Sequence, residues 1–242
     1  MKTYLITGAS SGIGYVIAGE LLKKGNRCVL VARNGEALSR LETAYPKRAF
    51  PYSCDLRETD AVVDIFVSLR EKGFLPLDGF IHCAGVAPLM RVDEADMNLV
   101  NETYTVNLFS FLEIMKYFVK EKNCRDGAAV VAISSVTAYR ASNRQSVYAG
   151  TKAALDASVR CMARELIPRK IRVNTVVSGV VETTMLQELR KASPGLDEKL
   201  KINCPLGVMQ PLDICHAIEY LLSDSATHIT GVSMPVDSGF LL

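Results

Sequence analysis

Short apolar runs alternate with longer helix-like segments along the whole chain, and this alternation constrains the fold more than any other feature. Most of the runs are almost continuously apolar, which is typical of parallel strands that are buried on both faces. The segments between them have helical periodicity; Leu155, Val159, Met162 and Leu166, for example, share one helix face. The expected strands are Thr3–Thr7, Arg27–Ala32, Arg48–Cys54, Leu77–Cys83, Ala128–Ser134, Ile171–Val177 and Val232–Val236.

Strands connected through helices favour right-handed crossovers, because a twisted strand followed by a helix packs back onto its sheet in that hand. We therefore expect an α/β fold: one domain over residues 1–242, with a doubly wound parallel sheet of about seven strands and helices on both faces. The length fits one large domain better than two small ones. A hydrophobic content of 49% and a charged content of 22% are sufficient for a sizeable core.

Residues 183–211 form the least regular part of the pattern. The segment is polar, contains Ser193-Pro194-Gly195 and follows an expected strand. In an open α/β sheet, irregular segments beyond the carboxyl ends of strands are where ligands bind. We expect this segment to be a mobile substrate loop.

Charge and cysteine content exclude several other classes of protein. A net charge of +2 does not indicate a nucleic-acid or membrane-surface partner. The seven cysteines contain no C-x-x-C pair, which favours free thiols in a reducing compartment. The three histidines lack metal-ligand spacing, so no metal site is expected. No secretory signal and no membrane-spanning apolar stretch is visible, and the expected location is the cytoplasm.

A glycine-rich turn follows the first expected strand, in the order Thr7-Gly8-Ala9-Ser10-Ser11-Gly12-Ile13-Gly14. Glycines permit a tight turn and a close approach of the backbone to a pyrophosphate, and the next helix offers unpaired N–H groups. Such a triplet could also be a purely structural turn. Its place after the first strand and at the start of a helix favours dinucleotide binding in a Rossmann-type fold.

Tyr148 and Lys152 are four residues apart at the start of a helical segment, so the phenol and the ammonium project from one face. Tyrosine, with a reference pKa of about 10, is a poor proton carrier at neutral pH, and a nearby cation lowers that pKa. The pair predicts general acid/base chemistry. The alternative is an incidental tyrosine and lysine on an amphipathic helix.

Ser135 follows an expected strand, thirteen residues before Tyr148. A hydroxyl at the carboxyl end of a strand faces the same cleft and can donate a hydrogen bond to a substrate carbonyl oxygen. A turn or cap role is the alternative for a serine at a strand end, and it fits Ser134 better than Ser135.

The pattern T-G-x-x-x-G-x-G with Gly8, Gly12 and Gly14, followed by Y-x-x-x-K at residues 148–152, resembles the short-chain dehydrogenase/reductase family in its compact single-domain form. The resemblance covers essentially the whole chain and is closest to 3-oxoacyl-[acyl-carrier-protein] reductases. It implies that Ser135 orients the substrate and Tyr148 is the general acid/base. It further implies that Lys152 also holds the nicotinamide ribose, and that Asn107 organises a water-linked proton relay to Lys152.

The resemblance also implies a cofactor site. Its expected members are Gly8, Ser10, Ser11, Gly12, Ile13, Gly14, Arg33, Asn34, Asp55, Leu56, Cys83, Ala84, Gly85, Tyr148, Lys152, Val181 and Thr183. In the family the acidic residue at Asp55 meets the adenine and the threonine at Thr183 holds the nicotinamide carboxamide. The chain departs from the family pattern where His82-Cys83-Ala84-Gly85 replaces Asn-Asn-Ala-Gly and where Ser178-Gly179 replaces Pro-Gly.

The end of the second expected strand predicts NADP(H) as the cofactor. Enzymes that use NAD typically carry an acidic residue there to bind the ribose 2′-hydroxyl. This chain has Ala32-Arg33-Asn34 instead, and the planar guanidinium of Arg33 suits a 2′-phosphate. The alternative is that Arg33 is only a surface cation.

The sequence thus predicts an oxidoreductase that transfers a hydride between NADP(H) and a small carbonyl or secondary-alcohol substrate. A 3-oxoacyl thioester, sugar, steroid, polyol or xenobiotic ketone all remain open as substrates. A catalytically silent NADP(H)-binding regulator is the alternative, although such a protein would be expected to lose the tyrosine or the lysine. An epimerase or dehydratase would need a larger substrate domain, and nothing after Pro211 is long enough to form one.

We also expect a homo-oligomer, a tetramer of D2 symmetry or a dimer. Segments 99–119 and 148–166 carry apolar residues on more than one face. The apolar terminus Phe240-Leu241-Leu242 has no evident place within one subunit.

Overall fold

The computed structural model describes residues 1–242 and contains one sheet of seven parallel strands in the order β3-β2-β1-β4-β5-β6-β7. The order reverses between β1 and β4, so the sheet is doubly wound, as the alternation predicted. The strands are β1 (Thr3–Thr7), β2 (Arg27–Ala32), β3 (Ala49–Ser53), β4 (Leu77–His82), β5 (Cys124–Ser135), β6 (Arg172–Ser178) and β7 (Ser233–Val236). All seven expected strands are present, and β5 begins earlier than predicted, at Cys124.

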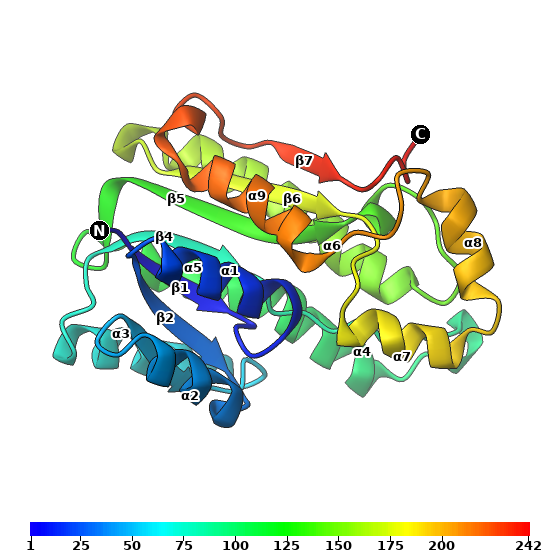
Figure 1. Cartoon of the computed structure of the whole chain (residues 1–242), viewed down its shortest axis with the longest axis horizontal. Helices are drawn as coiled ribbons and strands as arrows, with labels where there is room; N and C mark the ends of the chain where they lie inside the picture. Colours follow the sequence, from blue (N-terminus) through cyan, green and yellow to red (C-terminus); the bar gives the residue numbers. More distant parts are fainter.

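Helices cover both faces of this sheet (Figure 1). They are α1 (Gly12–Lys23), α2 (Gly35–Ala44), α3 (Val62–Glu71), α4 (Met97–Tyr104), α5 (Ser110–Phe118), α6 (Ser146–Glu165), α7 (Thr184–Ala192), α8 (Leu196–Asn203) and α9 (Pro211–Leu222). One core packs α1, α2 and α9 against the sheet, and the other packs α3, α5 and α6 against the opposite face. None of the helices has the length and the apolar character needed to cross a membrane.

The prediction of an irregular loop over residues 183–211 was wrong, because most of this segment folds into α7 and α8. Leu186 of α7 and Leu200 of α8 are buried in a small cluster of their own. Each helix buries so few side chains that its apolar stripe is narrow, and the polar remainder hid the helical pattern. Ser193-Pro194-Gly195 is the connection between the two helices, with Gly195 at φ +76°. Figure 1 shows α7 and α8 at the end of the sheet toward which the strand arrows point.

The carboxyl terminus is also packed differently from the prediction. Phe240 lies against the α7–α8 cluster within the same subunit. Arg140 donates to the Phe240 carbonyl at 2.6 Å, and its guanidinium lies 5.0 Å from the centroid of the Phe240 ring. Leu242, in contrast, is fully exposed. The apolar terminus therefore helps to hold α8 and does not need a second subunit for this purpose.

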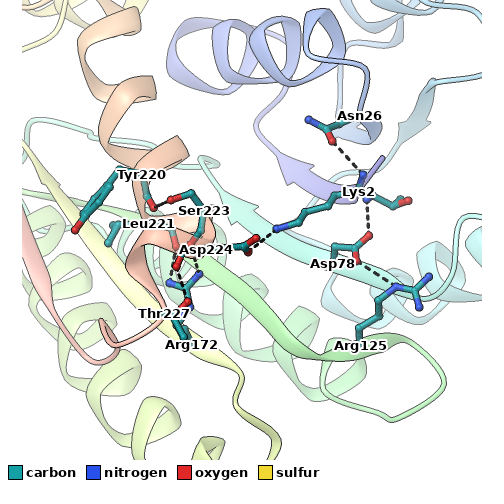
Figure 2. A network of polar contacts seen from close by, with 11 residues as sticks. Lys2, Asn26, Asp78, Arg125, Arg172, Tyr220, Leu221, Ser223, Asp224 and Thr227 are labelled. Atoms are coloured by element: carbon teal, nitrogen blue, oxygen red, sulfur yellow. Dashed lines mark hydrogen bonds and ion pairs between the residues drawn. The ribbon is translucent and has the colours of Figure 1, made fainter.

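A polar network joins the strands at the opposite, amino-terminal edge (Figure 2). The Thr3 N–H donates to the Asp78 carboxylate at 2.7 Å, which ties β1 to β4. Arg125 pairs with the other oxygen of Asp78 at 3.1 Å. Lys2 pairs with Asp224, beyond α9, at 3.0 Å. These contacts fix the edge of the sheet that lies far from the cleft.

Replacement of Asp78 by alanine should destabilise the protein by about 1–3 kcal/mol, because the N–H of Thr3, itself 6% exposed, is left without an acceptor. Thermal unfolding followed by circular dichroism should show a loss of a few degrees in Tm, at roughly 2–4 °C per kcal/mol for a chain of this size. Arg125→Ala is the matched control, since Arg125 is 59% exposed and should cost only about 0–1 kcal/mol. Equal losses in the two variants would contradict this account.

Candidate active site

The carboxyl ends of β1, β4, β5 and β6 meet at one edge of the sheet, because all strands run parallel. The glycine turn follows β1, Cys83–Gly85 follows β4, Ser135 ends β5 and Ser178 ends β6. The reversal in strand order falls between the first two of these segments, and ligands of open α/β sheets bind at such a point.

The glycine turn is packed so tightly that its backbone leaves no room for a side chain at Gly8 or Gly14. A Cβ on Gly14 would collide with the Gly8 carbonyl oxygen, and one on Gly8, at φ +65°, would lie 2.7 Å from the Ala84 nitrogen. The side chain of Ser11 precedes α1 but makes no capping hydrogen bond. The N–H groups in the first turn of α1 therefore have no side-chain acceptor and can bind an anion.

His82 is an interior residue, at the position where the family that the sequence resembles has an asparagine. It is fully buried, with its Nδ1 2.9 Å from Thr7 Oγ1, and the same hydroxyl accepts from Ala84 N at 3.4 Å. Burial lowers the pKa of His82 to about 3, so the imidazole is neutral at pH 7. His82 and Thr7 therefore link β4 to β1 directly beneath the glycine turn.

Asn107 was predicted on a helix, and the structure places it in a π-helical turn, Thr105–Phe109, between α4 and α5. Its side chain is fully buried. Nδ2 donates to the Val86 carbonyl at 2.9 Å and to Thr151 Oγ1 at 3.0 Å, and Oδ1 accepts from Val86 N at 2.8 Å. A widened turn of this kind often accompanies a functional site. Here it connects the segment after β4 with α6.

Lys152 is 3% exposed and donates from Nζ to the Ile133 carbonyl at 2.8 Å. Its Nζ lies 5.8 Å from the centroid of the Tyr148 ring, and a Cβ on Gly85 would lie 3.5 Å from Nζ. Burial lowers the pKa of Lys152 to about 8, against the opposing influence of Asp156. The ammonium is therefore charged at neutral pH but loses its proton more readily than an exposed lysine.

Tyr148 is partly exposed, and the Ser135 hydroxyl lies next to its phenol. Burial raises the pKa of Tyr148, while the interaction with Ser135 works against this shift. The prediction was that Lys152 lowers this pKa, whereas burial has the larger effect and raises it. Tyr148 therefore holds its proton at neutral pH.

Ser135 is 8% exposed and accepts hydrogen bonds from Thr137 N at 3.3 Å and from Thr137 Oγ1 at 3.0 Å. It thereby caps a short helix, Val136–Ala138. The cap role was predicted for Ser134, but that side chain donates to the buried Asp156 instead. Ser135 combines the cap with its position beside Tyr148.

The residues expected around the adenosine half of a dinucleotide lie at the ends of β2 and β3. Arg33 is exposed and pairs with no carboxylate. Asn34 caps α2 by accepting from the N–H groups of residues 36 and 37. Asp55 binds Arg57 through both carboxylate oxygens, and this contact lowers the pKa of Asp55. Leu56 is buried.

Thr183 closes the site from the side of β6. It caps α7, and its methyl carbon would lie 3.3 Å from a Cβ on Gly12, so the segment after β6 touches the glycine turn. Val181 is buried nearby. Ser10 and Ile13 lie in the turn itself and are partly exposed.

The structure thus places most of the predicted residues at the carboxyl ends of the parallel strands, with Arg33, Asn34, Asp55 and Leu56 at the ends of β2 and β3. Three further side chains, which were not predicted from the sequence, form hydrogen bonds to residues of the site or next to it: Thr7, Thr151 and Asp156. Only Asp156 left a signal, since it follows Lys152 by one helical turn.

Comparison with known proteins finds relatives along almost the whole chain. Residues 8–241 match the model of a family described as enoyl-(acyl carrier protein) reductase. The chain is 31% identical to L-xylulose reductase of Caenorhabditis elegans, over 99% of this chain and 95% of that protein. It is 30% identical to 3-oxoacyl-[acyl-carrier-protein] reductase of Homo sapiens, over 100% and 98% respectively.

Among solved structures, 4-hydroxyisoleucine dehydrogenase complexed with NADH matches with a TM-score of 0.89 and 28% identity, over 99% of this chain and 98% of that chain. The fold and the likeness along the whole chain agree. The chain belongs to the short-chain dehydrogenase/reductase family, whose members are oxidoreductases that use nicotinamide cofactors.

Proposed function

We propose that this chain transfers a hydride between NADP(H) and a small carbonyl or secondary-alcohol substrate, with Tyr148 as general acid/base. The observation that carries the proposal is the convergence of Tyr148, Ser135 and Lys152 beside the uncapped first turn of α1. Acid, oxyanion partner and cation then lie next to a site suited to a pyrophosphate.

The residues present fit a dinucleotide. The open N–H groups of α1 and the free Ser11 hydroxyl would receive its pyrophosphate, and Lys152 would hold the ribose next to the nicotinamide. Thr183 lies beside the same turn and would hold the carboxamide. When bound, the nicotinamide supplies the hydride.

The protein supplies the proton and the orientation. Tyr148 keeps its proton at neutral pH and so can donate it to a carbonyl oxygen, while Ser135 can donate a hydrogen bond to that oxygen. The Lys152 ammonium stabilises the phenolate left after proton donation. Asn107 fixes the segment after β4 against α6 and would organise the route by which Lys152 exchanges protons with water.

Two relatives are named as reductases, one of L-xylulose and one of a 3-oxoacyl group on acyl carrier protein. Both names describe reduction of a carbonyl group. A test panel for this chain should therefore begin with ketoses and 3-oxoacyl thioesters. The helices α7 and α8, which lie beyond the carboxyl end of β6, are the elements that we propose to contact the substrate.

Tyr148→Phe should lower kcat by about 10²–10⁴-fold with little change in the Kd for NADPH, because it removes a proton donor and almost no volume. Steady-state kinetics and fluorescence titration of NADPH measure the two quantities. Tyr220→Phe, the same change on an exposed residue of α9, is the matched control. Retention of more than about a tenth of wild-type kcat in Tyr148→Phe would contradict the assignment. Wild-type protein that binds NADPH but turns over no ketone would favour the regulator.

The preference for NADP(H) is argued from Arg33. Its guanidinium is exposed at the end of β2 and forms no ion pair within 4.0 Å, and Asp55, which follows β3, is bound by Arg57. An unpaired guanidinium at this place would bind a 2′-phosphate. Asp55 lies near enough for Arg33 to contribute to the lowering of its pKa, but its carboxylate is bound by Arg57.

The ratio of kcat/KM for NADPH to that for NADH tests this preference. Wild type should favour NADPH by at least about tenfold, roughly 1.4 kcal/mol, and Ala32→Asp/Arg33→Ile should reverse the order. Arg40→Ala, which removes an exposed arginine of α2, serves as the control for a general loss of positive charge. A wild-type preference for NADH would show that Arg33 is only a surface cation.

The chain should also form a homo-oligomer, as a tetramer or a dimer. Met97 of α4 and Phe109 at the end of the π-helical turn are 63% and 45% exposed, and such apolar side chains favour burial against a second copy. Light scattering coupled to size exclusion should give a multiple of the 26.5 kDa chain at micromolar concentration. A monomer mass would contradict this proposal.

A further inference from the structure

A buried carboxylate without a cationic partner lies directly behind the proposed catalytic residues. Asp156 is 2% exposed, and no lysine, arginine or histidine nitrogen lies within 4.0 Å of its oxygens. Its partners are three hydroxyls: Ser134 and Tyr139 each donate to Oδ2 at 2.9 Å, and Thr175 donates to Oδ1 at 2.7 Å. Neutral donors compensate only part of the cost of burying a carboxylate, so its presence needs a reason beyond packing.

The first reason is mechanical. Ser134 lies between two residues that the site depends on: Ile133, whose carbonyl accepts from Lys152 Nζ at 2.8 Å, and Ser135, which lies next to the phenol. By holding the Ser134 side chain, Asp156 fixes the end of β5 on both sides of it. A shift of that end would move the lysine anchor and the substrate-orienting hydroxyl together.

The second reason is electrostatic. Asp156 follows Lys152 by one turn on the same face of α6. The other titratable groups around Lys152 are neutral at pH 7: burial lowers the pKa of His82 to about 3 and raises the pKa of both Cys83 and Tyr148. Asp156 is therefore the acidic group near Lys152 that remains, and it opposes the effect of burial on the pKa of Lys152.

We propose that Asp156 is a positioning residue of the active site, whose carboxylate holds the end of β5 in place and keeps the Lys152 ammonium charged at the pH of catalysis. The inference rests on the proposed function only in taking Lys152 to act as a cation. Arg160, one turn further along α6, is an exposed cation, so water screens it and it does not neutralise the Asp156 carboxylate.

Direct titration of Lys152 in the cofactor-free protein tests the proposal. Lysine labelled with ¹³C at Cε gives one NMR signal per side chain, and the signal missing in Lys152→Met identifies residue 152. Asp156→Asn removes the charge but keeps the shape and most hydrogen bonds. It should weaken proton binding by Lys152 by about tenfold or more, a fall of about one pKa unit relative to wild type.

Thr175→Val is the matched control, because it removes one of the three hydroxyl donors and leaves the carboxylate in place. It should leave the midpoint of the Lys152 titration within a few tenths of a unit of wild type. The pH at which kcat/KM declines on the alkaline side should fall in Asp156→Asn together with the NMR midpoint. An unchanged Lys152 titration in Asp156→Asn would overturn the proposal and leave Asp156 a structural role alone.

If Asp156→Asn does not fold, Asp156→Leu/Thr175→Val removes the carboxylate together with one of its donors and should show the same fall in the Lys152 midpoint. The titration uses neither cofactor nor substrate, so its outcome is separate from that of the proposed function. Activity retained in Tyr148→Phe would refute the general acid and leave the Lys152 result standing. A fixed Lys152 midpoint would refute the role of Asp156 and leave the reaction standing.

Discussion

The parallel direction of all seven strands is the constraint on which the rest of this molecule depends. It places every carboxyl end at one edge, and the reversal of order between β1 and β4 separates the connecting segments there. The glycine turn, the segment after β4, the end of β5 and the segment after β6 face one another for this reason. At the other edge, contacts such as Thr3 to Asp78 hold the same strands without taking part in the cleft.

The cleft collects polar groups that are costly to bury, and each is held by a specific partner. Lys152 is anchored by the Ile133 carbonyl, Asn107 by Val86 and Thr151, and Asp156 by three hydroxyls. Such a network has one favourable arrangement, because each donor left unpaired in the interior destabilises the fold. The precision of the site and its stability thus have the same origin.

Departures from the family pattern are absorbed by local contacts. His82 stands where the family pattern has an asparagine; its Nδ1 contacts Thr7 Oγ1 and links β4 to β1, whereas its buried Nε2 has no hydrogen-bond partner. Residues 183–211 form two small amphipathic helices that pack against Phe240, where an irregular loop was predicted. Their narrow apolar stripes are stabilised by a tertiary contact from the carboxyl terminus, which no local pattern reveals.

The sequence by itself determined the strands, the glycine turn and the spacing of Ser135, Tyr148 and Lys152, because these follow from local periodicity and from residues close along the chain. Only the tertiary structure decided that Asn107 sits in a π-helical turn bonded to Thr151, and that burial raises the pKa of Tyr148. It also decided that Asp156 is enclosed by hydroxyls from β5, β6 and the segment after β5. Burial and hydrogen-bond partners depend on which distant segments pack together, and that information is absent from any single stretch of the chain.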